Sequence, residues 1–318
     1  MKGNNAPKAL TTQPNLTLAG LFRQYSTEEA CKGLLRDMRW PNGVECPRCK
    51  RKERVYALKA RPFHWVCKNA DCGKRQGYRF SVITKTIFEN TNYPLKTWFQ
   101  VIYLMSQSKK GMSALQIHRQ IGSGSYKTAW YMVMRIRAAM QGDAFPLTGQ
   151  IEVDETYVGG QAYNRHGGQI NRHGKGPRAP RGTFGKIAVI GAIARKGNVV
   201  CKVIENTDTA TLDKFVRTAV NHERVDLVAT DEHSGYRLLS KGADGLPHQV
   251  VRHSGGEYVR GIVHTNSIEG FWSLLKRGIV GSYHNVSKKY LPLYLNEFSF
   301  RYNNRNNPDI FRAVLAGC

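Results

Sequence analysis

Acidic residues stand in the middle of one short apolar run, residues 150–160, which reads Q-I-E-V-D-E-T-Y-V-G-G. Its β-branched residues favour a strand. Because neighbouring side chains of a strand point to opposite faces, Glu152 and Asp154 share one face, while Ile151 and Val153 share the other. A carboxylate in a buried strand costs free energy unless it is paired or holds a metal ion. We therefore predict that Asp154 is a metal ligand.

Two further acids are predicted to meet Asp154. Asp231 ends the apolar run 227–231, a buried type of strand, and Glu269 lies on the rim of the apolar face of a helix predicted over 266–278. Lys276 projects from the same side of that helix two turns later and could contact a phosphate. Any single acid is more often a surface charge, but three on separate elements can hold two Mg²⁺ ions for phosphodiester displacement.

Four of the seven cysteines fall within fewer than thirty residues, as a C-x2-C pair and a C-x4-C pair. Three short strands are predicted around them, over 55–58, 63–66 and 78–82. Paired thiolates over a small sheet are typical of a zinc ribbon, in which the ion supplies folding free energy. Four unrelated reduced thiols are the alternative. The predicted zinc ligands are Cys46, Cys49, Cys67 and Cys72.

A helical region over 94–140 contains a short helix ending at Ile121, a Gly-Ser turn, and a longer helix from Tyr126 to Met140. This order indicates a helix-turn-helix that contacts DNA, although a plain helical hairpin remains the alternative. We expect the longer helix to expose its polar side chains. The expected DNA contacts are Lys127, Tyr131, Arg135 and Arg137, with Arg277 from the later helix.

The net charge of +25 implies a polyanionic partner, with nucleic acid the first candidate. Residues 161–185 form a basic, Gly-rich segment, expected to be a loop that grips nucleic acid or a disordered surface loop. The first seventeen residues are polar and lack the apolar core of a signal peptide, so a cytoplasmic, nucleoid-associated protein is expected. Further helices are expected over 17–40, with Ser26 as an internal N-cap, and over 288–304 as the last helix.

In these motifs the chain resembles the DDE transposases of bacterial insertion sequences, specifically the ISXO2-like group with an N-terminal zinc ribbon. The resemblance covers roughly residues 40–304. Its motifs are the four cysteines, E-V-D-E-T-Y-V-G-G, A-T-D-E-H-S-G-Y, and H-T-N-S-I-E-G-F-W-S-L-L-K-R-G. The last is the most specific. The C-x4-C pair is longer than the commoner C-x2-C.

The resemblance implies an RNase H-like α/β domain, a mixed sheet flanked by helices, that binds Mg²⁺ or Mn²⁺ through Asp154, Asp231 and Glu269. It also implies that Lys276 contacts the transposon end. Because the group varies at its third acidic position, Asn266 and His264 remain alternatives to Glu269. The implied partners are the inverted repeats and target DNA, bound by at least a dimer. Two other functions stay open: a transposase-derived DNA-binding protein, and an RNase H-like nuclease without strand transfer.

The expected organisation has four parts. Residues 1–40 form a tail and helices, 41–90 the zinc ribbon, 91–145 the helix-turn-helix-like module, and 146–310 the catalytic domain with its basic insertion loop.

Overall fold

The computed structural model describes residues 16–73, 76–142, 146–159, 185–241, 245–252, 255 and 259–318. The predicted basic loop therefore lies almost wholly outside the described residues. The chain groups into two compact units, the first from Met1–Gln107, Ile117–Ala139 and Asn304–Cys318, the second from Ser108–Gln116 and Met140–Asn303.

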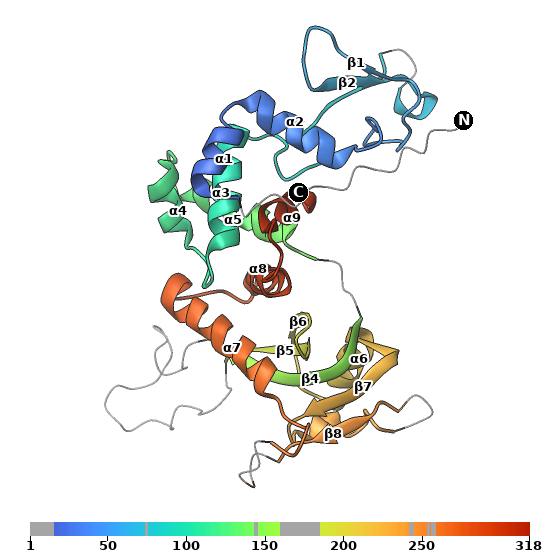
Figure 1. The fold of residues 1–318 in the computed structure, drawn as a ribbon, viewed down its shortest axis with the longest axis vertical. Helices are drawn as coiled ribbons and strands as arrows, with labels where there is room; N and C mark the ends of the chain where they lie inside the picture. Colours follow the sequence, from blue (N-terminus) through green and yellow to red (C-terminus); the bar gives the residue numbers. More distant parts are fainter. Residues whose placement is uncertain are drawn as a thin grey trace, which may run out of the picture. The chain divides into compact units, whose positions relative to one another are not determined.

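The first unit combines helices with a three-stranded antiparallel sheet in the order β1-β2-β3. Strands β1 and β2 of this sheet are labelled in Figure 1. The predicted ribbon strands are confirmed in position, each within a residue or two. Its strands are β1 (Val55–Ala57), β2 (His64–Cys67) and β3 (Tyr78–Ser81). Its helices are α1 (Leu18–Gln24), α2 (Glu28–Arg39), α3 (Leu95–Gln107), α5 (Tyr126–Ala139) and α9 (Ile310–Ala316), with a 3-10 turn over Ala70–Cys72. Helix α4 (Ala114–Ile121) runs across the boundary between the units.

Two expectations about this unit were wrong. The N-cap of α2 is Thr27, whose hydroxyl accepts from the Ala30 amide at 3.2 Å, so Ser26 lies one residue outside the helix. A further helix, α9, follows the helix that was expected to be the last, over 288–304, and was not predicted. It spans seven residues, too few for a helical period to stand out, but Asp309 caps it by accepting from the Arg312 amide at 3.0 Å.

The second unit is built on a mixed five-stranded sheet in the order β6-β5-β4-β7-β8. Strands β4 to β6 pair antiparallel, while β4 pairs with β7, and β7 with β8, in parallel. This order and these directions confirm the expected RNase H-like sheet. The strands are β4 (Leu147–Val158), β5 (Ile187–Ala194), β6 (Val199–Ile204), β7 (Val220–Thr230) and β8 (His248–Val250).

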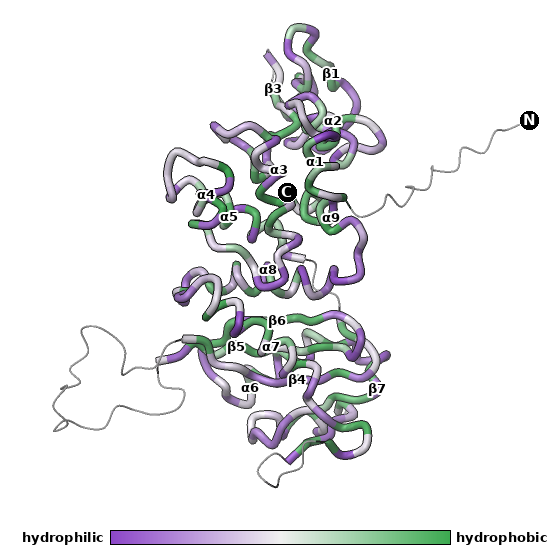
Figure 2. The backbone as a smooth tube through the Cα atoms, turned by 60° about the vertical axis from the view of Figure 1, so that its left-hand side comes forward, coloured by the Kyte–Doolittle hydropathy of each residue, from purple (hydrophilic) through white to green (hydrophobic). Residues whose placement is uncertain are grey.

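Helices cover both faces of this sheet. Helix α6 (Thr209–Ala219) packs on the face that carries Ile151 and Val153. Its side chains Leu212 and Val216 share one apolar cluster with these two residues. Figure 2 shows hydrophobic residues along β5, which is buried for nearly its whole length. Helix α7 (Asn266–Gly278) lies across β4 and β5 on the other face (Figure 1) and is continued by a π-helical turn, Ile279–Tyr283. Helix α8 (Leu291–Asn303) contacts β6.

Candidate active site

Asp154 and Asp231 lie on neighbouring parallel strands of the second unit. Glu152 of β4 is level with Ala229 of β7, so two residues further on Asp154 reaches the level of Asp231, the first residue after β7. The Asp231 carboxylate accepts from the His233 amide at 3.1 Å, which fixes the turn after the strand. Asp154, within the central strand β4, and Asp231, at the end of β7, therefore lie beside each other.

Glu269 enters from the first turn of α7, on the face of the sheet that carries Asp154. The Thr265 hydroxyl donates to its carboxylate at 2.7 Å. Glu269 is exposed, and Lys276, two turns later, is exposed as well. The predicted order of strand, strand end and helix is thus present, with the lysine on the same side of α7 as Glu269.

The neighbouring acids affect the ionisation of Asp154. Burial raises the pKa of Asp154 to about 7, and the negative charges of Asp231, Glu155 and Glu269 add to that rise. In the part of the chain that the structure describes, no lysine or arginine forms an ion pair with Asp154, Asp231 or Glu269. Uncompensated negative charge in a strongly basic chain is the condition that a divalent cation relieves, so this donor set fits Mg²⁺ or Mn²⁺.

The carboxylates are spaced more widely than the ligands of one ion. Among the described residues only the four cysteines form a group of ligand atoms that all lie within 4.8 Å of one another. A pair of ions about 3.5–4 Å apart does not require every ligand to touch the same ion. The acids are therefore gathered around Asp154 without forming a single compact cage.

Trp272 of α7 was not predicted to belong to this site. Its indole Nε1 donates to Asp154 Oδ2 at 3.1 Å. The ring lies over Gly191, which is directly opposite Asp154 in β5, and a Cβ at Gly191 would come within 2.6 Å of the indole. Glycine at this position lets α7 approach the sheet closely enough for Trp272 to reach the carboxylate.

We expect Trp272→Phe to raise the pKa of Asp154 still further, because the indole donor stabilises the ionised carboxylate. A titration of the Asp154 side-chain carboxyl by ¹³C NMR measures this. Trp98→Phe is the matched control, because it removes a hydrogen bond of 2.8 Å from an indole Nε1 to the Thr91 hydroxyl in the first unit. An unchanged or lower pKa for Asp154 in Trp272→Phe would contradict the assignment of this bond.

The alternative third positions are placed differently. His264 directs Nδ1 toward Glu152, 3.1 Å away, in an orientation that is not that of a hydrogen bond. Asn266 is the first residue of α7 and is exposed. The negative charge of Glu269 is among the causes that raise the pKa of Asp154, so Glu269 lies near that carboxylate.

The four cysteines of the first unit form a metal centre of the expected kind. Sγ of Cys46 lies 3.6 Å from Sγ of Cys72, and Sγ of Cys49 lies 3.7 Å from Sγ of Cys67. These separations are too long for disulfides and match neighbouring thiolates of a tetrahedral zinc site with Zn–S bonds of about 2.3 Å. The buried Asn69 amide donates to Cys67 Sγ at 3.2 Å, a contact that the cysteine spacing did not reveal. The cluster fits a structural zinc ion.

The predicted helix-turn-helix elements are present, with one correction. The Ser113 hydroxyl caps α4 by accepting from Gln116, and α5 begins at Tyr126 as expected. Lys127, Tyr131 and Arg135 are exposed, as is Arg277 on α7. Arg137 was expected to be exposed and is 1% exposed instead. It falls among the apolar positions of α5, where it contacts the sulfur of Met134 at 3.6 Å.

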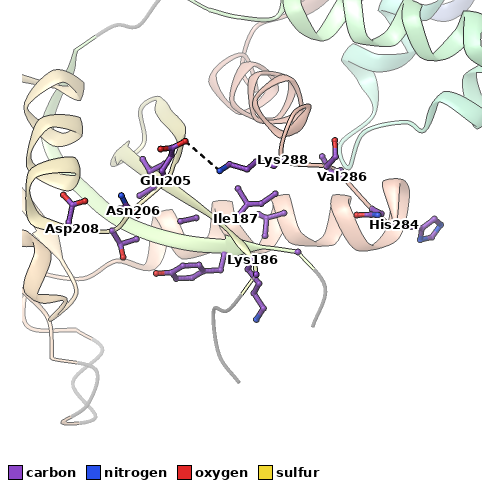
Figure 3. Close-up of a pocket in the computed structure, with 17 residues that line it drawn as sticks. Lys186, Ile187, Glu205, Asn206, Asp208, His284, Val286 and Lys288 are labelled. Carbon is purple, nitrogen blue, oxygen red and sulfur yellow. Dashed lines mark ion pairs between the residues drawn. The ribbon is translucent and has the colours of Figure 1, made fainter. Parts of the chain in front are cut away.

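A cavity of about 1050 Å³ in the second unit is not the site of these acids. Its lining includes Lys186, Glu205 and Lys288, and Figure 3 shows Lys288 directed toward Glu205, 4.0 Å away. Neither Asp154 nor Asp231 nor Glu269 lines it.

In the described part of the chain, no helix is both long and apolar enough to cross a membrane.

Comparisons with known proteins agree with this geometry. Residues 146–303 match the ISXO2-like transposase domain, and residues 26–75 match the transposase zinc-ribbon domain. A protein described as uncharacterized in transposable element ISH50, from Halobacterium salinarum, is 30% identical over 284 residues, which cover 88% of this chain and 92% of that protein. An uncharacterized transposase-like protein of Haemophilus influenzae is 28% identical over 125 residues, covering 38% of this chain and 97% of that protein.

Among solved structures, a chain of the simian T-cell lymphotropic virus intasome in complex with PP2A regulatory subunit B56 gamma overlaps 64% of this chain and 65% of its own. The identity is 10% and the TM-score is 0.29, which is too low to define a shared fold. The assignment rests instead on the match to the ISH50 protein, which covers 88% of this chain, and on the two domain matches. The chain belongs to the transposases in which a zinc ribbon precedes an ISXO2-like transposase domain.

Proposed function

We propose that this transposase cuts DNA at the inverted-repeat ends of its insertion sequence and joins the freed ends to target DNA. The observation that supports this most is the meeting of three carboxylates from β4, the end of β7 and α7 around Asp154. Asp154, Asp231 and Glu269 would hold the divalent cations. When bound, two such ions supply charge stabilisation for both the attacking and leaving oxygens of a phosphodiester.

The chain's own residues contribute binding and orientation. Exposed Lys276 and Arg277 on α7 would contact the phosphates of the transposon end beside the acids. Membership of a transposase family implies DNA binding, and Lys127, Tyr131 and Arg135 on α5 would provide part of it. The net charge of +25 supports a strong dependence of DNA affinity on salt. We also propose that the protein acts as at least a dimer on DNA.

A strand-transfer assay tests this function. Purified protein, Mg²⁺, labelled inverted-repeat DNA and a target plasmid should give joined products. Cleavage without joining would identify a nuclease instead, and binding without cleavage would identify a DNA-binding protein. Glu269→Gln should abolish the products, whereas Asn266→Ala and His264→Gln should keep at least about a tenth of the wild-type rate. The opposite pattern would move the third acidic position to one of those two residues.

A further inference from the structure

Glu152 is a fully buried carboxylate that the chemistry above does not use. It is 0% exposed, and it lies two residues before Asp154 on the same face of β4. An isolated charge at such a place would cost several kcal/mol, so its partners decide its role.

Those partners come from the start of α7. Glu152 Oε2 accepts from the backbone amides of Ser267 at 2.7 Å and Ile268 at 3.1 Å, and Oε1 accepts from the Ser267 hydroxyl at 2.9 Å. These amides are among the first four of the helix, which have no partner within it. Glu152 therefore caps α7 from a strand more than a hundred residues earlier, at the positive end of the helix dipole.

Arg195, just after β5, compensates the buried charge and extends the contact. Its Nε donates to Glu152 at 2.8 Å, and its other nitrogens donate to the carbonyls of Ile262 at 2.6 Å and His264 at 3.1 Å. One guanidinium thus joins the buried carboxylate to the segment that leads into α7. The bond geometry fixes where that helix begins relative to the sheet.

The capping of α7 by Glu152 affects Glu269 through the side chain of Thr265. This residue is at the N-cap position of α7, yet its side chain makes no capping hydrogen bond. Because Glu152 satisfies the amides that an N-cap threonine usually serves, the Thr265 hydroxyl can donate to Glu269 instead, at 2.7 Å. Thr265 is 1% exposed, so this bond forms in a packed environment.

We propose that Glu152, with Arg195, is a positioning residue: by capping α7 from β4 it sets the helix and frees Thr265 to orient Glu269 toward Asp154. This inference rests on the proposed function of the three acids. It adds a supporting pair that touches neither the ions nor the DNA, whose task is the geometry of the third acid.

Mn²⁺ binding to the full-length protein, followed by electron paramagnetic resonance, tests the inference without DNA or turnover. Glu152→Asp keeps the charge but shortens the side chain, so the amides of Ser267 and Ile268 should exchange hydrogen faster and Mn²⁺ affinity should fall about tenfold or more. Thr265→Val should leave those amides protected and still weaken Mn²⁺ binding by about threefold or more.

Glu297→Gln is the matched control, because Glu297 is also 0% exposed and paired with an arginine, Arg301, in the same unit. It should leave Mn²⁺ affinity within about twofold. Normal Mn²⁺ affinity in Thr265→Val, or in a folded Glu152→Asp protein with rapidly exchanging amides, would overturn the positioning role. Wild-type Mn²⁺ binding that Asp154→Asn does not alter would instead overturn the proposed metal site itself.

Discussion

Asp154→Asn is expected to reduce cleavage of inverted-repeat DNA by about a thousandfold or more in Mg²⁺, and at the same time to make the metal-free protein more stable. The loss follows because ion ligation contributes several kcal/mol of transition-state stabilisation, and each 1.36 kcal/mol changes the rate tenfold. Single-turnover cleavage at saturating DNA measures it. A matched substitution outside the site, Asp213→Asn, removes only a helix ion pair with Arg217 and should keep the wild-type rate.

The gain in stability follows from the pKa of Asp154. Folding raises this pKa from 3.8 to about 7, so between these values the native state holds a proton that the unfolded state has lost. Stability of the metal-free protein therefore falls as pH rises through that window, and the loss is complete above pH 7. Asparagine carries no charge, so at pH 8 Asp154→Asn should raise the free energy of unfolding by about 2–4 kcal/mol. Urea denaturation at pH 4 and pH 8, in buffer without Mg²⁺ or Mn²⁺ and without a chelator that would strip the zinc ribbon, checks this, since the gain should vanish at pH 4.

If the Asp154→Asn protein cleaved DNA at the wild-type rate, Asp154 would not be a metal ligand. An unchanged free energy of unfolding at pH 8 would show that burial and the neighbouring carboxylates do not destabilise the ionised form of Asp154 in the folded protein. The cleavage rate depends on Asp154 with Mg²⁺ bound, whereas the free energy of unfolding depends on Asp154 without Mg²⁺. The two measurements therefore test the catalytic role and the electrostatic cost of this side chain separately.

The elements and the acids could be predicted because their signals are local. Alternation placed Glu152 and Asp154 on one face of β4, and a period of 3.6 residues placed α7 at Asn266–Gly278. The supporting contacts were not predictable in this way. Arg195 and Glu152 lie 43 residues apart and are brought together by the antiparallel pairing of β5 with β4. Trp272 reaches Asp154 across 118 residues through the packing of α7 on the sheet.

Arg137 is a residue for which a local signal gave the wrong prediction. Its charge suggested a DNA contact, yet it stands one residue after Ile136 within the stripe of α5 that the first unit buries. A basic side chain on a helix predicts exposure only where the neighbouring elements leave that face open, and the sequence of α5 alone does not state which face α9 and α3 cover.

Removal of the metal from the cysteine cluster has the other large expected effect. The ribbon buries few side chains of its own around Trp65 and Phe80, whose rings stack 5.9 Å apart, so the ion would contribute most of its folding free energy. Structural zinc sites contribute about 10–16 kcal/mol in small peptides. We expect Cys67→Ser, or strong chelation, to unfold β1 to β3 while the second unit keeps its sheet. Hydrogen exchange resolved by segment measures both at once.

The control for this experiment is Cys318→Ser, because the Cys318 thiol donates to the Val314 carbonyl at 3.2 Å and a hydroxyl can make the same bond. It should leave the ribbon amides protected and the zinc content at one ion per chain. A Cys67→Ser protein with a protected β2 would show that Trp40, Trp65 and Phe80 hold the ribbon without the ion. Loss of ribbon protection with unchanged affinity for inverted-repeat DNA would confine zinc to folding and leave DNA recognition to other elements, α5 first among them.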